Sequence, residues 1–105
     1  MGETLSKIGI VVSTYNSNIT QRLLEGSLES LQSAGWNGEK VETLKVPGAW
    51  ELPLAAQRLL DRDEVLGVVV LGAVIRGETT HDQHINRAVS SALMDLMLAS
   101  GKPVG

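Results

Sequence analysis

The residues best suited to chemistry in this sequence form one short run, residues 77–81, which reads Gly-Glu-Thr-Thr-His. Thr79 and Thr80 add hydroxyl donors to the open backbone of Gly77, and His81 adds an imidazole that titrates near neutral pH. A helix is expected to begin here, and the first N–H groups of a helix attract anions. The run predicts a pocket for one phosphate, with the Glu78 carboxylate turned outward and His81 beside it as a general acid or base.

His81 also has simpler interpretations. A solvated histidine in the first turn of a helix needs no role, and His84 lies close enough along that helix to suggest a shared metal. The sequence has no third His and no Cys, and Asp82 would point the other way around the helix, so we expect no metal. It also has neither a dinucleotide fingerprint nor a Walker loop, and no cofactor is expected.

Alternating strands and helices are predicted to position this run. Apolar runs at residues 8–15, 41–46 and 65–71 predict strands, and residues 103–104 resemble the beginning of a fourth. The helices are predicted from apolar stripes at Ile19, Leu23, Leu24, Leu28 and Leu31, at Leu52, Ala55, Ala56, Leu59 and Leu60, and at Ile85, Ala88, Val89, Ala92, Leu93 and Leu96. We therefore expect residues 1–105 to form one three-layer, doubly wound, flavodoxin-like α/β domain, with a four-stranded parallel sheet in the order 2-1-3-4.

The ends of the predicted helices carry their own signals. The first helix is expected to follow the turn residues 16–18 and to end at Gly35, and the second to begin at Trp50. Thr80 and Gln83 form a capping-box pair at the start of the third.

Composition excludes several classes of function. The net charge is -3, from 9 basic and 12 acidic residues mixed along 105 positions. This distribution gives no basic patch of the kind that binds nucleic acid or a membrane surface. The absence of cysteine excludes disulfides, and the apolar runs are too short to span a membrane. The N-terminus lacks the pattern of a signal peptide, so a cytoplasmic protein is expected.

Three segments should meet at one edge of the predicted sheet, because ligands of open parallel sheets lie beyond the carboxyl ends of the strands. They are residues 14–16, 47–51 and 77–81. Two of the three aromatic residues, Tyr15 and Trp50, fall in these segments, which suggests stacking on a planar ligand. The alternative is that both rings only plug the edge of the sheet.

Three ordered motifs resemble the lumazine synthase (6,7-dimethyl-8-ribityllumazine synthase) family. They are Tyr15-Asn16 with Ile19-Thr20, residues 47–53 (Pro-Gly-Ala-Trp-Glu-Leu-Pro) and residues 71–81 (Leu-Gly-Ala-Val-Ile-Arg-Gly-Glu-Thr-Thr-His). The resemblance implies the penultimate step of riboflavin biosynthesis. In that step 5-amino-6-(D-ribitylamino)uracil condenses with 3,4-dihydroxy-2-butanone 4-phosphate, orthophosphate leaves, and no cofactor takes part.

The resemblance also implies roles for individual residues. Tyr15 would stack on the pyrimidine ring, where the family usually has Phe or Trp, and His81 would transfer protons. The remaining substrate-binding positions would be Asn16 with the backbone of Val74 and Ile75 at the ring edge, Ala49, Trp50 and Glu51 at the ribityl chain, and Gly77, Glu78, Thr79 and Thr80 at the phosphate.

Members of the family assemble as pentamers, and often twelve pentamers form a cage of sixty subunits, with each site between neighbours. This sequence departs from the family pattern at Asp82, where an aromatic residue is common, and it ends at Gly105. In the family a C-terminal segment follows, with an aromatic residue, an Arg and a Lys that complete the site. The fold would thus lack its C-terminal helices.

That topology leaves one face of the sheet bare over strands three and four, at Val68 and Val70 or at their alternating neighbours. We therefore expect a segment of a longer working protein, or a separate chain that completes the sheet. Two other functions stay open. One is a cage or scaffold subunit with impaired catalysis, and the other is a flavin- or pteridine-binding module that uses Tyr15 and Trp50.

Overall fold

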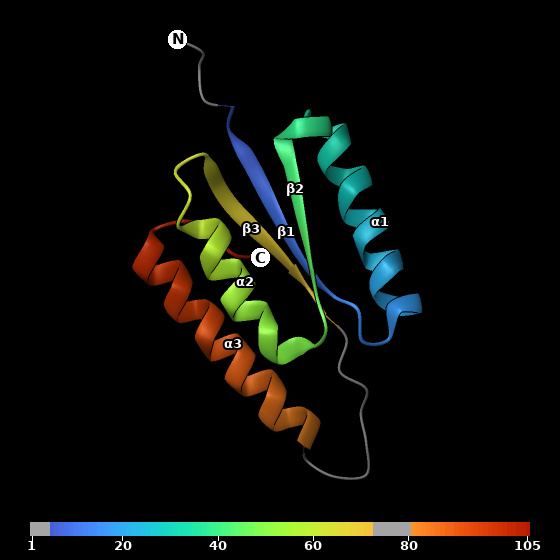
Figure 1. Ribbon diagram of the computed structural model, residues 1–105, viewed down its shortest axis with the longest axis vertical. Coiled ribbons are helices and arrows are strands. Elements are labelled where there is room, and N and C mark those ends of the chain that lie inside the picture. Colours follow the sequence, from blue (N-terminus) through green and yellow to red (C-terminus); the bar gives the residue numbers. More distant parts are fainter. Residues whose placement is uncertain (1–4, 73–80) are drawn as a thin grey trace.

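The computed structural model describes residues 5–72 and 81–105, and within the last helix the side chains from residue 83 onward. Its elements follow one another along the chain as strand, helix, strand, helix, strand and helix, with two short 3₁₀ turns (Figure 1). They are β1 (Lys7–Ser13), α1 (Ser17–Ser33), η1 (Gly38–Lys40), β2 (Val41–Val46), η2 (Ala49–Glu51), α2 (Leu52–Leu60), β3 (Val65–Leu71) and α3 (His81–Ser100).

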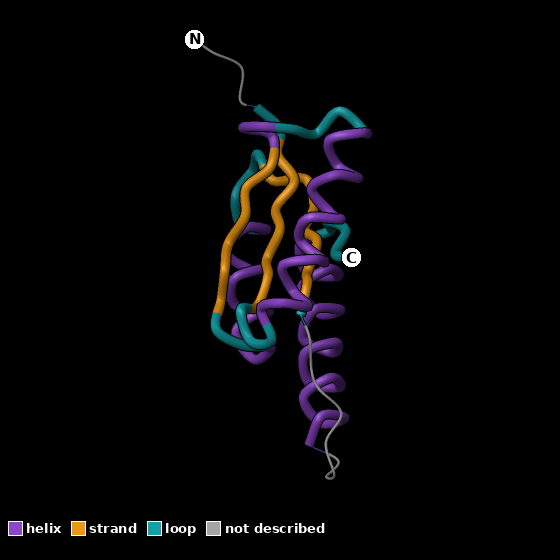
Figure 2. Tube along the Cα trace, turned by 90° about the vertical axis from the view of Figure 1, so that its right-hand side faces the viewer, coloured by secondary structure: helices purple, strands orange, loops and turns teal. Residues whose placement is uncertain are grey.

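The sheet is parallel, and its strand order is β2-β1-β3. Strand β1 lies in the centre, with Ile8 beside Val41 on one edge and beside Gly67 on the other. Helix α1 covers one face of the sheet, and α2 and α3 cover the other (Figures 1 and 2). The predicted three-layer α/β architecture is therefore confirmed for the described part of the chain.

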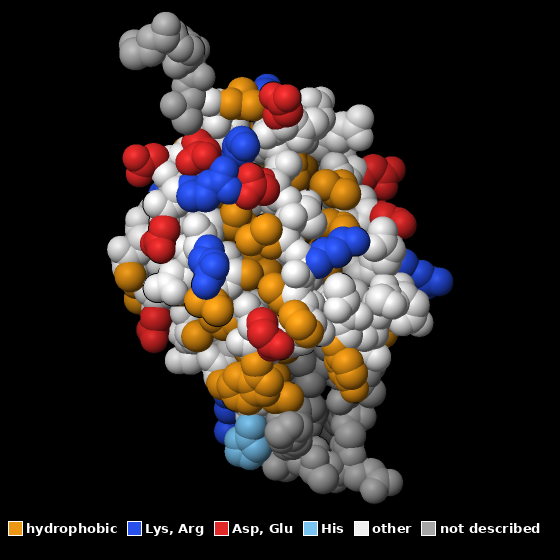
Figure 3. Space-filling model, viewed as in Figure 1, with side chains coloured by type: hydrophobic (Ala, Val, Ile, Leu, Met, Phe, Trp, Pro, Cys, Tyr) orange, Lys and Arg blue, Asp and Glu red, His pale blue; other side chains and the backbone are white. Residues whose placement is uncertain are grey.

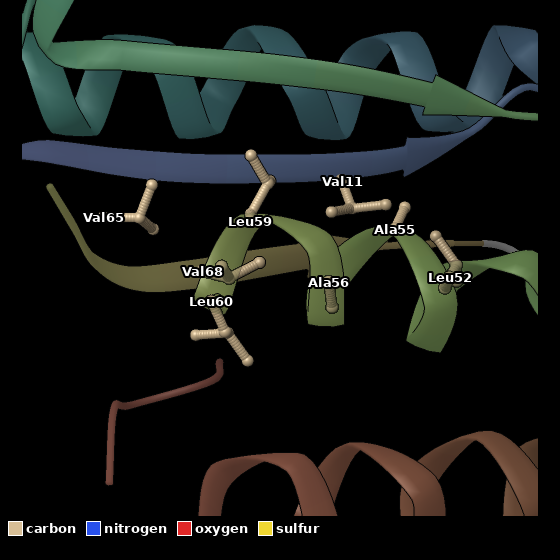
Figure 4. Close-up of a cluster of buried hydrophobic side chains, with 8 residues drawn as sticks. All are labelled: Val11, Leu52, Ala55, Ala56, Leu59, Leu60, Val65 and Val68. Atoms are coloured by element: carbon tan, nitrogen blue, oxygen red, sulfur yellow. The ribbon is translucent and has the colours of Figure 1, made fainter. Parts of the chain in front are cut away.

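Strand β1 is apolar from Ile8 to Val12 because both of its faces are covered there. Ile10 and Val12 pack against Leu24 of α1, and Val11 points to the opposite face. The larger core lies on that opposite face, between β1, β3 and α2 (Figure 4). Its buried members are Val11, Leu52, Ala55, Ala56, Leu59, Leu60, Val65 and Val68.

The predicted fourth strand is present only as one bridge in the described residues. Val104 pairs in parallel with Val68, and the Val68 N–H donates to the Pro103 carbonyl oxygen at 3.0 Å. The Val70 N–H donates to the Gly105 carbonyl oxygen at 2.8 Å. The described sheet therefore has three strands, with the final residues lying along the outer edge of β3.

Helix α1 buries less of its apolar stripe than its periodicity predicts. Leu24 is buried and Leu31 is half-buried, whereas Ile19, Leu23 and Leu28 are exposed. The reason is geometric: α1 contacts the sheet mainly through Leu24 and Leu31, so the flanks of its stripe do not reach the strands. A groove lined by Leu23, Ser27, Ser30, Leu31 and Val69 runs along one flank.

The uncovered apolar surface predicted on the α1 side of β3 lies at the residues that alternate with Val68 and Val70, not at Val68 and Val70 themselves. Val68 is buried on the α2 side of the sheet, and Val70 packs against the same core. On the α1 side, Val69 and Leu71 are half-buried, and the nearby Leu66 of β3 is 46% exposed. The apolar face is thus partly open beside β3.

The element ends differ slightly from the sequence-based expectation. Strand β1 ends at Ser13 rather than near Tyr15, and α2 begins at Leu52 because residues 49–51 form a 3₁₀ turn. Helix α1 ends at Ser33, just before Gly35, whose φ of 94° ends the helix. The predicted capping pair involves Thr80, which lies outside the described residues.

Candidate functional site

The loops that follow β1 and β2 are joined at the carboxyl ends of their strands. The Thr14 N–H donates to the Val46 carbonyl oxygen at 2.7 Å, and the Tyr15 N–H donates to the Pro47 carbonyl oxygen at 3.1 Å. These two bonds continue the β1–β2 pairing beyond the last strand residues. Two of the three predicted segments, residues 14–16 and 47–51, therefore meet at one edge of the sheet.

Both aromatic side chains at this edge are open to solvent. Tyr15 is 61% exposed, and Trp50 is 58% exposed. A ring that plugged the end of the sheet would be buried, so that alternative does not describe either residue. Figure 3 shows hydrophobic side chains at the surface near the amino end of α2, where η2 carries Trp50.

Asn16 has an unusual backbone and an unsatisfied side chain. Its φ of 59° and ψ of 54° lie in the left-handed region, which Asn tolerates better than most residues. Its carbonyl oxygen accepts hydrogen bonds from the N–H groups of Ile19 and Thr20, at 2.9 and 3.1 Å. Its amide nitrogen is buried and has no hydrogen-bond partner among the described residues. A buried amide nitrogen without a partner is suited to donate a hydrogen bond to a group outside the described residues.

The η2 turn holds the other described candidates. Ala49 and Glu51 are half-buried, and the Glu51 N–H donates to the Gly48 carbonyl oxygen at 3.2 Å. The Glu51 carboxylate folds back over Gly48, with Oε2 about 3.7 Å from the position that a Cβ would take there. Glu51 therefore stays close to the loop and does not extend away from it.

Most of the third predicted segment lies outside the described residues. Val74, Ile75, Gly77, Glu78, Thr79 and Thr80 lie outside the described residues, as does the side chain of His81. The backbone of His81 opens α3, and α3 begins beyond the carboxyl ends of the strands (Figure 1). His84 is exposed one turn further along. No group of three or more potential metal-ligating side chains occurs among residues 5–72 and 83–105.

A hollow of about 340 Å³ lies beneath this edge, between α3 and the sheet. Ala49, Leu52, Val70 and Gly72 line one side of it, and none of its lining residues in the described part of the chain has a titratable side chain. These residues offer mainly apolar contacts.

Sequence reasoning missed the hydroxyl of Ser13. This residue ends β1, is fully buried, and has no hydrogen-bond partner among the described residues. The only sequence signal is a polar residue at the end of an apolar strand.

A second polar group that the sequence did not suggest lies at the opposite end of the sheet. Arg62 pairs with Glu42 and Glu64, and Lys7 Nζ lies 3.6 Å from Glu42 Oε1. The hydrogen bond from Arg62 lowers the pKa of Glu64, and the same contact raises the pKa of Arg62. Because Lys7 begins β1 and Glu64 precedes β3, this network closes the amino ends of the strands, away from the candidate site.

Comparison with known proteins decides the family. The family model for 6,7-dimethyl-8-ribityllumazine synthase matches residues 6–105. The chain belongs to this family.

Proteins named 6,7-dimethyl-8-ribityllumazine synthase are similar to this member over nearly its whole length. The Rhodopirellula baltica protein is 46% identical over 99 residues, which cover 94% of this chain and 64% of the relative. The Staphylothermus marinus protein is 45% identical over 101 residues, covering 96% and 66%. The Thermus thermophilus protein is 44% identical over 98 residues, covering 93% and 62%. The chain thus spans slightly less than two thirds of the length of these lumazine synthases.

None of the helices among the described residues combines the length and the apolar character needed to cross a bilayer.

Proposed function

We propose that this chain carries lumazine synthase chemistry. It would condense 5-amino-6-(D-ribitylamino)uracil with 3,4-dihydroxy-2-butanone 4-phosphate and release orthophosphate and water as the second ring closes. The observation that carries this proposal is the family match over residues 6–105, whose first two motifs meet at one edge of the sheet. A cytoplasmic location belongs to the proposal, and the cysteine-free composition supports it.

The pyrimidine substrate would bind over the joined loops. The exposed ring of Tyr15 would stack on the heterocycle, and the unpartnered amide of Asn16 would bond to its polar edge with the backbone of Val74 and Ile75. The η2 residues Trp50 and Glu51, with Ala49, would hold the ribityl chain. The hydrogen bond from Tyr15 to Pro47 supports this arrangement, because it fixes the two loops relative to each other.

The phosphate and the proton transfers would belong to the third motif. The phosphate would bind at Gly77, Glu78, Thr79 and Thr80, next to the amino end of α3. His81 would move protons between the condensing amine, the carbonyl and the leaving phosphate. The neutral imidazole is the form that a general base needs.

The direct test is to mix the chain with both substrates and record the fluorescence of the lumazine product. We expect a rate above the uncatalysed background. His81→Ala should slow turnover about a hundredfold or more while substrate binding persists. His84→Ala is the matched control, since it removes the other histidine of the same helix, and it should leave the rate unchanged. A wild-type rate equal to the uncatalysed background would refute the proposed enzymatic activity. Tight riboflavin binding without turnover would instead select a flavin-binding module.

We also propose self-association as a pentamer, with a sixty-subunit cage as its larger form, and a complete fourth strand on the outer edge of β3. An apolar groove between α2 and α3 supports the first part; Trp50, Pro53, Leu54, Ala88, Ala92 and Leu96 are among its lining residues. The parallel bridge at Val104 supports the second. Sedimentation velocity tests the assembly: a single monomeric species at micromolar concentration would rule it out for this chain, and hollow particles without turnover would favour a scaffold subunit.

A further inference from the structure

The three loops that leave the carboxyl ends of the strands share one packing junction beneath them. Ser13 ends β1, Leu52 follows the η2 turn, and Gly72 comes directly after β3. A Cβ atom on Gly72 would lie 2.9 Å from Leu52 Cδ1 and 3.5 Å from Ser13 Oγ. The Cβ position of Gly72 therefore lies within 3.5 Å of a side-chain atom of each of the other two residues.

The first of these distances is too short for two carbon atoms. Leu52 Cδ1 lies where a side chain on Gly72 would have to go, and Leu52 is itself buried in the core with Val11 and Ala55. Because Leu52 directly follows Glu51, a displacement of its backbone moves the turn that carries Trp50 and Glu51. The missing side chain of Gly72 thus leaves room for Leu52, the residue that directly follows η2.

We propose that Gly72 is a positioning residue. Because it has no side chain, Leu52 can pack beside it, and this packing holds the η2 turn in the position that substrate binding needs. The expected effect on substrate binding rests on the proposed function, whereas the expected effect on the position of η2 does not. Gly72 acts through Leu52 and touches no reacting atom.

The chain offers a matched control for Gly72→Ala. A Cβ on Gly9, in the middle of β1, would lie 2.7 Å from Leu59 Cδ1, at the other end of α2. Gly9→Ala therefore adds the same methyl group against a buried leucine of the same helix, far from the loops. Both variants should lower the melting temperature. Only Gly72→Ala should move η2.

Trp50 provides a readout that needs no substrate. The chain has two tryptophans, so the measurement uses a Trp36→Phe background in which Trp50 alone emits. We expect Gly72→Ala to shift the Trp50 emission maximum and its quenching by acrylamide, and Gly9→Ala to leave both unchanged. Equal spectra for the two variants would overturn the inference, since Leu52 would then have turned into the adjacent hollow without moving η2.

Ligand binding gives the second readout. The probe is the pyrimidine substrate with a nitro group in place of its 5-amino group. Its binding is measured by titration calorimetry. We expect Gly72→Ala to weaken its binding about tenfold and Gly9→Ala to change it less than twofold. If the wild-type chain does not bind the probe, the proposed function fails for this chain, while the Trp50 spectra still decide the positional part.

A compensating change tests the route through Leu52. Leu52→Val removes the Cδ1 atom that a Cβ on Gly72 would meet, so the double variant Gly72→Ala with Leu52→Val should recover the Trp50 spectrum and the affinity of Leu52→Val alone. Should Gly72→Ala fail to fold, the double variant should fold again. A double variant that stays unfolded, or that folds with the shifted spectrum, would show that Gly72 does not act through Leu52.

Discussion

Arg62 donates two hydrogen bonds to the same carboxylate oxygen of Glu64, from Nη2 at 2.8 Å and from Nε at 3.3 Å. The pair closes the loop that leads from α2 into β3. Since these bonds require an ionised carboxylate, they tie the stability of this end of the sheet to pH.

The first prediction concerns that pH dependence. Arg62 holds the pKa of Glu64 below its ordinary value of 4.5. The stabilisation is therefore complete above about pH 4.5 and is lost as the pH falls through the lower pKa of the folded state. Melting curves of wild type and Glu64→Gln should differ most at pH 7, and the difference should shrink as the pH falls below 4.5. Glu29→Gln, on the exposed face of α1, is the control. A difference that stays constant as the pH falls from 7 to the acid limit of folding would contradict the linkage.

The second prediction concerns Lys102. Its Nζ donates to the carbonyl oxygens of Leu60 at 2.8 Å and Arg62 at 2.9 Å, which lie at the carboxyl end of α2. Lys102→Met keeps the apolar stem and removes these bonds, and should cost about 1 kcal/mol of unfolding free energy. Amide exchange at Val70 should also accelerate, because its N–H bonds to Gly105 nearby in the sequence. Lys45→Met, on exposed β2 surface, should change neither quantity.

The third prediction concerns the core. Leu59 is buried against β1 and β3, so Leu59→Ala should cost about 2–5 kcal/mol in urea unfolding. Leu98 is 72% exposed on α3, and Leu98→Ala should cost less than about 0.5 kcal/mol. Similar costs at the two positions would mean that the core lies elsewhere.

The fourth prediction separates the two roles of Asn16. Glycine accepts a φ of 59° and alanine does not, so Asn16→Ala should be about 1 kcal/mol less stable than Asn16→Gly. Both variants lack the amide, so both should bind the pyrimidine probe more weakly than wild type. Retention of full affinity by Asn16→Gly would limit Asn16 to a backbone role.

The sequence predicts most of the described fold because its strongest signals are local. The β-branched runs of β1 and β3 predict strands buried on both faces, and the stripe of α2 matches its buried side. The stripe of α1 misleads because periodicity reports which side of a helix is apolar, not how much of that side the sheet contacts.

The site is less predictable than the fold, for a related reason. The order of strands and loops predicts that the segments at residues 14–16 and 47–51 share an edge. The junction of Ser13, Leu52 and Gly72 depends on distances between three distant parts of the chain. The pairing of Arg62 with Glu42 likewise joins residues 20 positions apart, in the loop after α2 and in β2, which residue spacing does not reveal.

The central place of β1 has a consequence for the newly made chain. Its second neighbour, β3, begins only at Val65, so the segment from β1 to β3 must all emerge from the ribosome before β1 can pair on both edges. Until then Ile10, Val11 and Val12 form an apolar strand with an open side. We expect the strand to be prone to association over that interval, and the sheet to form only after β3 has emerged.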